Sequence, residues 1–397
     1  MIRFPIYMDN HATTRVDPRV LETMLPYFGE TFGNAGSTTH AFGWAAKEAV
    51  ERAREQIAAA VGARAREIVF TSGATESNNL AIRGVAEKYA RKGKHFISVA
   101  TEHPSVLDPL KSLRRRGYDV TLLPVVQAPD DRAGRLLPDR VAEAIRDDTI
   151  LVSVMLANNE IGAIQPLEEI GRICKARGVL LHSDATQAVG RIPVDVQQLQ
   201  VDLMSFSAHK LYGPKGAAAL YVRRRDPHVR LEPLVEGGGQ EGGLRSGTLN
   251  VPGIVGFARA VELCLEEMPG ESQRLGTRRD RLYQGLTAAL SGVTLNGPAL
   301  GLPELRLPGN LNVSFAHVDG EALLMSMKEL ALSSGSACSS ADPEPSHVLR
   351  SLGIAEELTR SSVRFGLGRF NTAEEVDFAV ATVSETVTRL RKMSSMA

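Results

Sequence analysis

A lysine and an aspartate follow two hydrophobic runs in the middle of the chain. Lys210 stands in SFSAHKLYGPKG, directly after a polar turn, and Asp184 stands in HSDATQ. Taken alone, Lys210 is more typical of a surface lysine. A lysine buried beside other cations, however, has a lowered pKa and forms Schiff bases. Because a pyridoxal-phosphate (PLP) site needs such a lysine and a carboxylate at the pyridine nitrogen, the pair favours PLP chemistry.

The segment TSGATESNNLAIRG predicts a strand that runs through Gly73 into a helix beginning near Thr75. The start of such a helix directs free backbone N–H groups and a positive dipole end at one point, with the hydroxyls of Ser72 and Thr75 beside it. A phosphate group fits there. An ordinary helix capped by Ser72 explains the same residues, and for this segment alone it is the favoured interpretation.

Three cysteines occur without a C-x-x-C pair, which indicates neither a disulfide framework nor a structural zinc site. Cys174 and Cys264 have the helical spacing of buried apolar positions. Cys338 instead lies in LSSGSACSSADPEPS, whose six serines, glycine, aspartate and prolines are typical of a mobile loop at about 332–346. An accessible thiol on such a loop is suited to be a nucleophile, and the residues support a reactive and an inert role about equally.

Two further side chains could contact a cofactor or a substrate. His103 in TEHPSV follows a predicted strand end, where its ring could face a cofactor, although a loop histidine bonded to backbone explains it as well. Arg364 in SSVRFGLGR could clamp a carboxylate, or could be a surface arginine of a strand. The nine histidines form no H-E-x-x-H or His/Cys cluster, so we expect no metal site.

Short apolar runs alternate with helical patterns from about residue 18 to residue 222, and the candidate functional residues directly follow the apolar runs. This alternation predicts a layered α/β domain with a largely parallel sheet, in which ligands bind at the carboxyl ends of the strands. Helical periodicity from about 251 to 290 predicts a bridge to a small α+β domain with NLNVSFAHV and SSVRFGLGRF as strands. The predicted strands of the large sheet cover 68–70, 95–99, 119–123, 150–155, 179–182, 202–206 and 218–222.

Composition excludes several function classes. Among 397 residues, 46 Lys and Arg balance 46 Asp and Glu, so no basic field or stripe predicts binding to nucleic acid. No stretch reaches the length of a membrane span, and the N-terminus MIRFPIYMDNHATTRV lacks the pattern of a signal peptide. We therefore expect a cytoplasmic protein that does not associate with membranes.

Nine segments together resemble the cysteine desulfurases of iron-sulfur assembly, and they follow the order of that family over nearly the whole chain. They are YMDNHATTRVDPRV, GNAGSTTHAFGW, EIVFTSGATESNNLAI, TEHPSVLD, NNEIGAIQP, HSDATQAVGRIPVDV, DLMSFSAHKLYGPKGAAALYVRR, GGGQEGGLRSGT and SSGSACSSADPEPSHVLRSLG. The resemblance implies a PLP-dependent transferase of fold type I, in the class V aminotransferase group, that acts as a homodimer. It implies a large PLP-binding domain at 16–260 with a mostly parallel seven-stranded sheet. Residues 1–15 and 261–397 would form the small α+β domain with the catalytic-cysteine loop.

The resemblance also implies a role for each matching residue. Lys210 would bind PLP as the Schiff-base lysine and then move the Cα proton, Asp184 would pair with the pyridine nitrogen, Gln187 with the ring hydroxyl, and His103 would stack on the ring and move protons. The phosphate cradle would contain Ala74, Thr75, Ser207, His209 and, from the second subunit, Thr248. The groups around the substrate carboxylate would be Asn34, Asn159 and Arg364.

The implied reaction converts L-cysteine to L-alanine and leaves the sulfur as a persulfide on Cys338. An acceptor protein, such as an iron-sulfur scaffold or a protein of another thiolation pathway, would then take the sulfur by thiol exchange. A selenocysteine lyase or another class V PLP enzyme is the alternative, and Cys338 argues against a plain aminotransferase. A non-catalytic scaffold is disfavoured because Lys210, Asp184 and Cys338 are all present.

Overall fold

The computed structural model describes residues 2–334 and 345–394, so Cys338 lies outside the described residues. The predicted α/β fold is confirmed. Seven strands form one sheet in the order β2-β8-β7-β6-β5-β3-β4, in which β8 is antiparallel to both of its neighbours and the other pairs are parallel. All seven predicted strands are present, with ends that differ by at most two residues. They are β2 (Ile68–Thr71), β3 (His95–Val99), β4 (Asp119–Leu123), β5 (Thr149–Ser153), β6 (Leu180–Asp184), β7 (Leu203–Ser207) and β8 (Ala218–Val222).

Helices cover both faces of this sheet and bury two hydrophobic clusters. Val69 packs in one cluster, whereas its neighbours Ile68 and Phe70 pack in the other, because successive side chains of a strand point to opposite faces. The near-continuous burial of the central strands follows from this coverage. The helices of this part are α1 (Pro18–Met24), α2 (Pro26–Gly29), α3 (Ala41–Ala60), α4 (Ala74–Lys88), α5 (Pro104–Arg115), α6 (Pro138–Ala144) and α7 (Leu167–Ala176).

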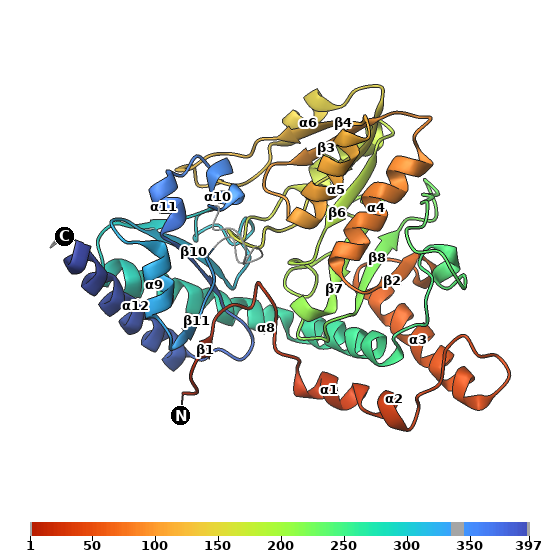
Figure 1. Ribbon diagram of the computed structural model, residues 1–397, viewed down its shortest axis with the longest axis horizontal. Coiled ribbons are helices and arrows are strands. Elements are labelled where there is room, and N and C mark those ends of the chain that lie inside the picture. The colour runs from red at the N-terminus through yellow and green to blue at the C-terminus, as the bar shows by residue number, and fades with distance from the viewer. Residues whose placement is uncertain (1, 335–344, 395–397) are drawn as a thin grey trace.

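The long helix α8 (Val251–Ala289) connects the large sheet with the C-terminal part, as the sequence predicts (Figure 1). Its first residues pack in a cluster of the large sheet, and Leu275, Leu282 and Leu286 pack in a separate cluster. Asn250 caps the helix by accepting a hydrogen bond from the N–H of Gly253.

The C-terminal part has a three-stranded antiparallel sheet with β10 at its centre. Near it, β1 of the N-terminal segment pairs in parallel with β11. Both predicted strands of this part, β10 and β12, are confirmed. The elements are β1 (Ile6–Tyr7), β9 (Val293–Leu295), β10 (Asn310–Phe315), α9 (Gly320–Ser326), β11 (Leu330–Ala331), α10 (His347–Ser351), α11 (Glu356–Arg360), β12 (Ser362–Gly366) and α12 (Ala373–Ser394).

The predicted domain boundary at residue 260 falls inside α8, and the one at residue 16 falls just before α1, so the division into two domains stays a prediction. Within 2–334 and 345–394, no helix has the length and apolar character needed to cross a membrane. Over the same ranges, His, Cys, Asp and Glu side chains form no group of three or more that could hold a metal ion.

Candidate active site

A cavity of about 450 Å³ opens where strands β2, β3, β5, β6 and β7 end. Because β2 and β7 both run antiparallel to β8, the carboxyl ends of these strands lie at one edge of the sheet. Ligands bind at this edge in open α/β sheets. The cavity brings together ten of the residues predicted from the sequence, which are Ala74, Thr75, His103, Asn159, Asp184, Gln187, Ser207, His209, Lys210 and Arg364.

Lys210 ends a short turn that follows β7, and its side chain reaches across to the N-terminal segment. Its Nζ donates hydrogen bonds to the carbonyl oxygens of His11 at 2.5 Å and Ala12 at 2.6 Å. The neighbouring His209 is partly buried, and burial followed by the charge of Lys210 lowers its pKa to about 4. His209 is therefore neutral beside the ammonium group at physiological pH.

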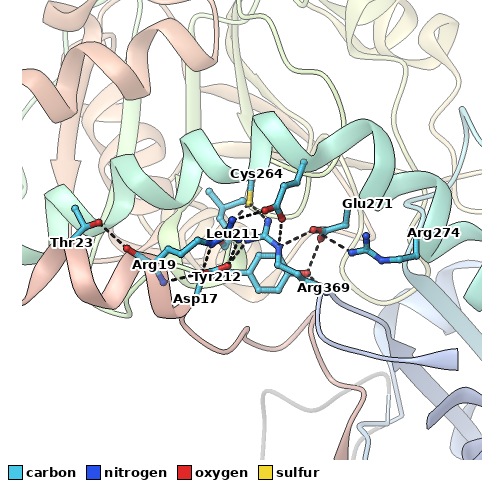
Figure 2. A network of polar contacts seen from close by, with 10 residues as sticks. Asp17, Arg19, Thr23, Leu211, Tyr212, Cys264, Glu271, Arg274 and Arg369 are labelled. Carbon is cyan, nitrogen blue, oxygen red and sulfur yellow. Dashed lines mark hydrogen bonds and ion pairs between the residues drawn. The ribbon is translucent and has the colours of Figure 1, made fainter. Parts of the chain in front are cut away.

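The residues that directly follow Lys210, Leu211 and Tyr212, belong to a network of polar contacts (Figure 2). Tyr212 adopts a left-handed backbone conformation with φ of 61°, which is uncommon for a residue with a side chain. Its hydroxyl accepts a hydrogen bond from the N–H of Arg369 at 2.7 Å, and the Arg369 guanidinium lies 4.3 Å from the centre of its ring. Arg369 also pairs with Asp17 at 2.8 Å and Glu271 at 2.9 Å. These contacts offset the strain of the turn and hold Lys210 in place.

Asp184, the last residue of β6, is buried with 6% of its surface exposed. Its Oδ2 accepts a hydrogen bond from Asn78 Nδ2 at 2.8 Å, and its Oδ1 accepts one from the N–H of Thr186 at 3.0 Å. Both oxygens of the carboxylate therefore accept hydrogen bonds from the protein. The Asp184 side chain also lines the cavity. A carboxylate in this state stabilises a protonated ring nitrogen.

Helix α4 begins at Ala74, and Gly73 rather than Ser72 is its N-cap, without a side-chain hydrogen bond. The capping interpretation of Ser72 is therefore wrong, since its hydroxyl instead donates to the carboxylate of Glu76. A Cβ built on Gly73 would meet no atom within 4 Å, so the start of the helix is open to the cavity. The first turn of a helix leaves N–H groups without helical partners, which suits a phosphate.

His103 caps helix α5 and lines the same cavity. Its Nδ1 accepts the N–H of Ser105 at 3.1 Å. Burial lowers the pKa of His103, so the ring is neutral and its proton is on Nε2. The preceding residue, Glu102, is fully buried, and burial raises its pKa well above the ordinary value. A neutral His103 with its proton on Nε2 could stack on an aromatic ring and exchange a proton with it.

Arg364 of β12 carries its guanidinium into the cavity with only 2% of the side chain exposed. Asp9 binds one end of it at 2.8 Å, and the carbonyl oxygen of Asn159 accepts a hydrogen bond from Nη1 at 3.3 Å. Its Nε has no hydrogen-bond partner among the described residues. The protein thus orients the guanidinium of Arg364, which lines the cavity and is suited to bind a carboxylate.

Two predicted site residues, Asn34 and Thr248, are not among those that line this cavity, and a third cannot be placed. Asn34 lies at a second cavity of about 510 Å³, which is lined by Gln240, Glu241 and Leu249 among others. Thr248 is exposed next to that cavity. Cys338 lies outside the described residues. The roles of these three residues stay predictions.

Sequence reasoning missed His11, which lines the cavity, and Arg191, whose Nη2 donates a hydrogen bond to the carbonyl oxygen of Lys210 at 3.2 Å. Arg191 Nη1 lies 2.6 Å from His11 Nδ1 and 3.1 Å from Gln187 Oε1, and Gln187 Nε2 donates to the carbonyl oxygen of His11 at 2.8 Å. Burial lowers the pKa of His11 well below its ordinary value. The signal that could have found His11 is its place in YMDNHATT, one of the segments of the family resemblance.

Comparison with known proteins decides the family. The aminotransferase class-V family matches residues 6–378. The cysteine desulfurase IscS of an Anaeromyxobacter species is 58% identical over 395 residues, which are 100% of this chain and 95% of that protein. The human cysteine desulfurase is 52% identical over 392 residues, with 99% of this chain and 84% of the relative covered. This chain belongs to the cysteine desulfurases.

Solved structures agree with this assignment to the cysteine desulfurases. A NifS-like protein has a TM-score of 0.88 and 39% identity, with 97% of this chain and 100% of that chain covered. A structure described as SspA in complex with cysteine has a TM-score of 0.80 and 36% identity, with 92% of this chain and 99% of that chain covered. The family and fold inferred from the sequence are therefore confirmed.

Cysteine desulfurases of class V depend on PLP, and the residues around the cavity fit this cofactor. An anion can bind at the open start of α4, a buried carboxylate is available from Asp184, and Lys210 lines the same cavity. Two buried polar atoms of cavity residues, His11 Nε2 and Thr186 Oγ1, lack partners among the described residues. A polar ligand would satisfy such atoms.

Proposed function

We propose that this chain takes sulfur from L-cysteine, releases L-alanine and holds the sulfur as a persulfide on Cys338. The observation that carries the assignment is the convergence of Lys210, Asp184 and Arg364 in one cavity of a cysteine desulfurase. The residues that border the segment with Cys338 contact neighbours of this site, because Ser333 binds Asp9, the partner of Arg364, and Ser346 binds Glu160, which follows Asn159.

The cofactor would be held by residues from several strand ends. Asp184 would bind the ring nitrogen, Gln187 the ring hydroxyl and Lys210 the aldehyde carbon, while His103 would lie on the ring face. The phosphate would be bound by Ala74, Thr75, Ser207, His209 and Thr248 of a second copy of the chain. When bound, PLP supplies an electron sink that makes the Cα proton of cysteine removable and weakens its Cβ–S bond.

The side chains of this protein would orient the substrate and move its protons. Arg364, Asn159 and Asn34 would bind the carboxylate of cysteine, which places Cα beside Lys210. Lys210 would take the Cα proton, with His103 as a second group that exchanges protons. The thiolate of Cys338 would attack the substrate sulfur. A sulfur–sulfur bond forms, the Cβ–S bond breaks, and the electron pair stays with Cβ, which is protonated to give alanine.

The persulfide on Cys338 would pass its outer sulfur to a thiol of an acceptor protein by exchange. The family resemblance of the sequence supports an acceptor in iron-sulfur cluster assembly or in another thiolation pathway. The cytoplasmic location expected from the sequence stays a prediction.

The test is a reaction with L-cysteine and without reductant, followed by amino-acid analysis and mass spectrometry of the peptide that contains Cys338. We expect one added sulfur on this peptide and an equal amount of alanine, and neither product from Cys338→Ala. Cys174→Ala is the matched control, because burial raises the pKa of Cys174 to about 12 and makes it inert. Alanine formed by Cys338→Ala at the native rate would contradict the proposal, and bound PLP without either product would favour selenocysteine as substrate.

We further propose that the chain forms a homodimer through an aromatic surface on α1, α2 and the start of α3. Large exposed apolar side chains gather there, namely Leu21, Leu25, Phe28, Phe32, Phe42 and Trp44, with exposed fractions from 49% to 65%. Apolar patches of this kind mark protein interfaces. The exposure of Thr248 supports the same arrangement, because a residue that serves the second subunit's site must be at the surface.

Replacing both Phe28 and Phe32 with glutamate is expected to convert the dimer to a monomer, because it places charges in an apolar contact. Sedimentation velocity at several protein concentrations measures this change. Met325→Glu, on α9 and 68% exposed, is the control that should remain dimeric. A native protein that sediments as a monomer at all concentrations would rule out the homodimer.

A further inference from the structure

The segment that carries Cys338 is fixed at both ends by the same kind of contact. Ser333 Oγ donates a hydrogen bond to Asp9 Oδ2 at 2.7 Å, and Ser346 Oγ donates one to Glu160 Oε2. Both serines are buried, with 8% and 4% of their surface exposed. Each end therefore has a hydroxyl bound to a carboxylate at a position where little water competes.

The C-terminal contact involves the residues that flank two site residues. Glu160 directly follows Asn159, and its backbone carbonyl accepts hydrogen bonds from Asn310 at 3.1 Å and Asn312 at 3.3 Å. His347, next to Ser346, has its Nε2 2.9 Å from the carbonyl oxygen of Glu102, which precedes His103. The start of α10 is thereby joined to the loops that carry Asn159 and His103.

Glu160 is itself in an unusual position for a carboxylate. It is 5% exposed, and burial raises its pKa to about 7. A buried acid costs stability unless it is compensated, so its presence here favours a functional reason. The Ser346 hydroxyl offsets part of this cost by donating a hydrogen bond to the carboxyl group of Glu160.

The N-terminal contact involves the residue that would bind the substrate carboxylate. Asp9 uses its other oxygen to bind Arg364 at 2.8 Å, and the backbone N–H of Arg364 donates to the carbonyl oxygen of Ser333 at 2.9 Å. The same carboxylate therefore orients the guanidinium in the cavity and holds the start of the segment with Cys338.

We propose that Asp9 and Glu160 are positioning residues for sulfur transfer, because they hold both ends of the Cys338 segment beside the substrate site. Cys338 is five positions after Ser333 and eight positions before Ser346. The two contacts hold Ser333 and Ser346, which border the segment, beside residues that would bind the substrate, and this favours transfer of its sulfur. This inference rests on the proposed function.

The test separates sulfur transfer from the chemistry at Cα. Exchange of the Cα proton of L-alanine in D₂O, followed by NMR, depends on Lys210 and PLP but needs no thiol. Formation of the Cys338 persulfide in a single turnover, followed by mass spectrometry, needs Lys210 and PLP and also the thiol. For Glu160→Ala we expect persulfide formation to slow about 10-fold, as the loss of one charge-assisted hydrogen bond implies, with exchange changed less than about twofold.

Three variants sharpen this test. Glu160→Gln keeps an oxygen that accepts the Ser346 hydroxyl and should recover most of the rate. Ser333→Ala removes the N-terminal contact without replacing Asp9 or Arg364, and should slow persulfide formation in the same selective way. Glu321→Ala, at an exposed position of α9, is the control and should match the native protein.

A second readout uses the protein without PLP. Loss of the Glu160 contact should speed cleavage within 334–345 by a protease of broad specificity several-fold, while Tm stays within a few degrees of the native value. Equal losses of exchange and persulfide formation, or an unchanged rate of persulfide formation in Glu160→Ala, would overturn the positioning role. If the native protein formed no persulfide at all, the proposed function would fail. If the cleavage rate were unchanged in Glu160→Ala, the contact between Glu160 and Ser346 would have no role in holding the segment, and the proposed function would still stand.

Discussion

Replacing Lys210 with alanine is expected to lower the rate of alanine formation from L-cysteine by at least about 1,000-fold. The substitution removes both the amine that would bind the cofactor and the group that would move the Cα proton. The cavity itself should persist, because the turn is held by Tyr212 and Arg369 rather than by the lysine side chain. Steady-state assays of alanine at saturating cysteine and PLP measure the effect.

The loss in Lys210→Ala should also be visible before any turnover. The absorbance band of a PLP Schiff base in the visible range should be missing from the purified variant. Lys88→Ala, on the exposed side of α4, is the matched control and should keep both the band and the rate. A variant that keeps more than about a tenth of the native rate would show that another group serves as base.

Replacing Asp184 with asparagine is expected to lower kcat by at least about 100-fold, a loss of the size seen when one aligned electrostatic group is removed from an active site. Asparagine has nearly the same shape, but it has no charge to keep the ring nitrogen protonated. It also supplies one acceptor oxygen for the two donors, Asn78 Nδ2 and the Thr186 N–H, so a small decrease in Tm should accompany the loss.

The charge effect at Asp184 can be separated from a packing effect. The kcat for L-cysteine and the dissociation constant for PLP should be measured together, with Asp147→Asn at an exposed position as the control. A native kcat together with a native dissociation constant for PLP in Asp184→Asn would show that the carboxylate is not the partner of the ring. A loss confined to PLP affinity, with full kcat at saturating PLP, would assign Asp184 to cofactor binding alone.

Part of the site was predictable because local patterns determine where strands end. The largely apolar runs 95–99 and 218–222 match the observed strands, since strands covered on both faces are rich in apolar residues. Parallel strands place their carboxyl ends at one edge. Asp184, Lys210 and His103 therefore had to meet, and the structure brings them to one cavity.

Other features required the tertiary structure, because they join residues far apart in the chain. Nothing local to Lys210 indicates that its amine reaches the backbone of His11, or that Arg369 stabilises the left-handed Tyr212. The contacts of Ser333 with Asp9 and of Ser346 with Glu160 likewise join residues that are far apart in the chain. Sequence alone determined the family and the sheet and indicated the candidate reactive groups, through local hydrophobic patterns and ordered motifs. Only the packing of the N-terminal segment, β12 and α10 against the large sheet decided how those groups are oriented, because a side chain's direction depends on partners that no local pattern specifies.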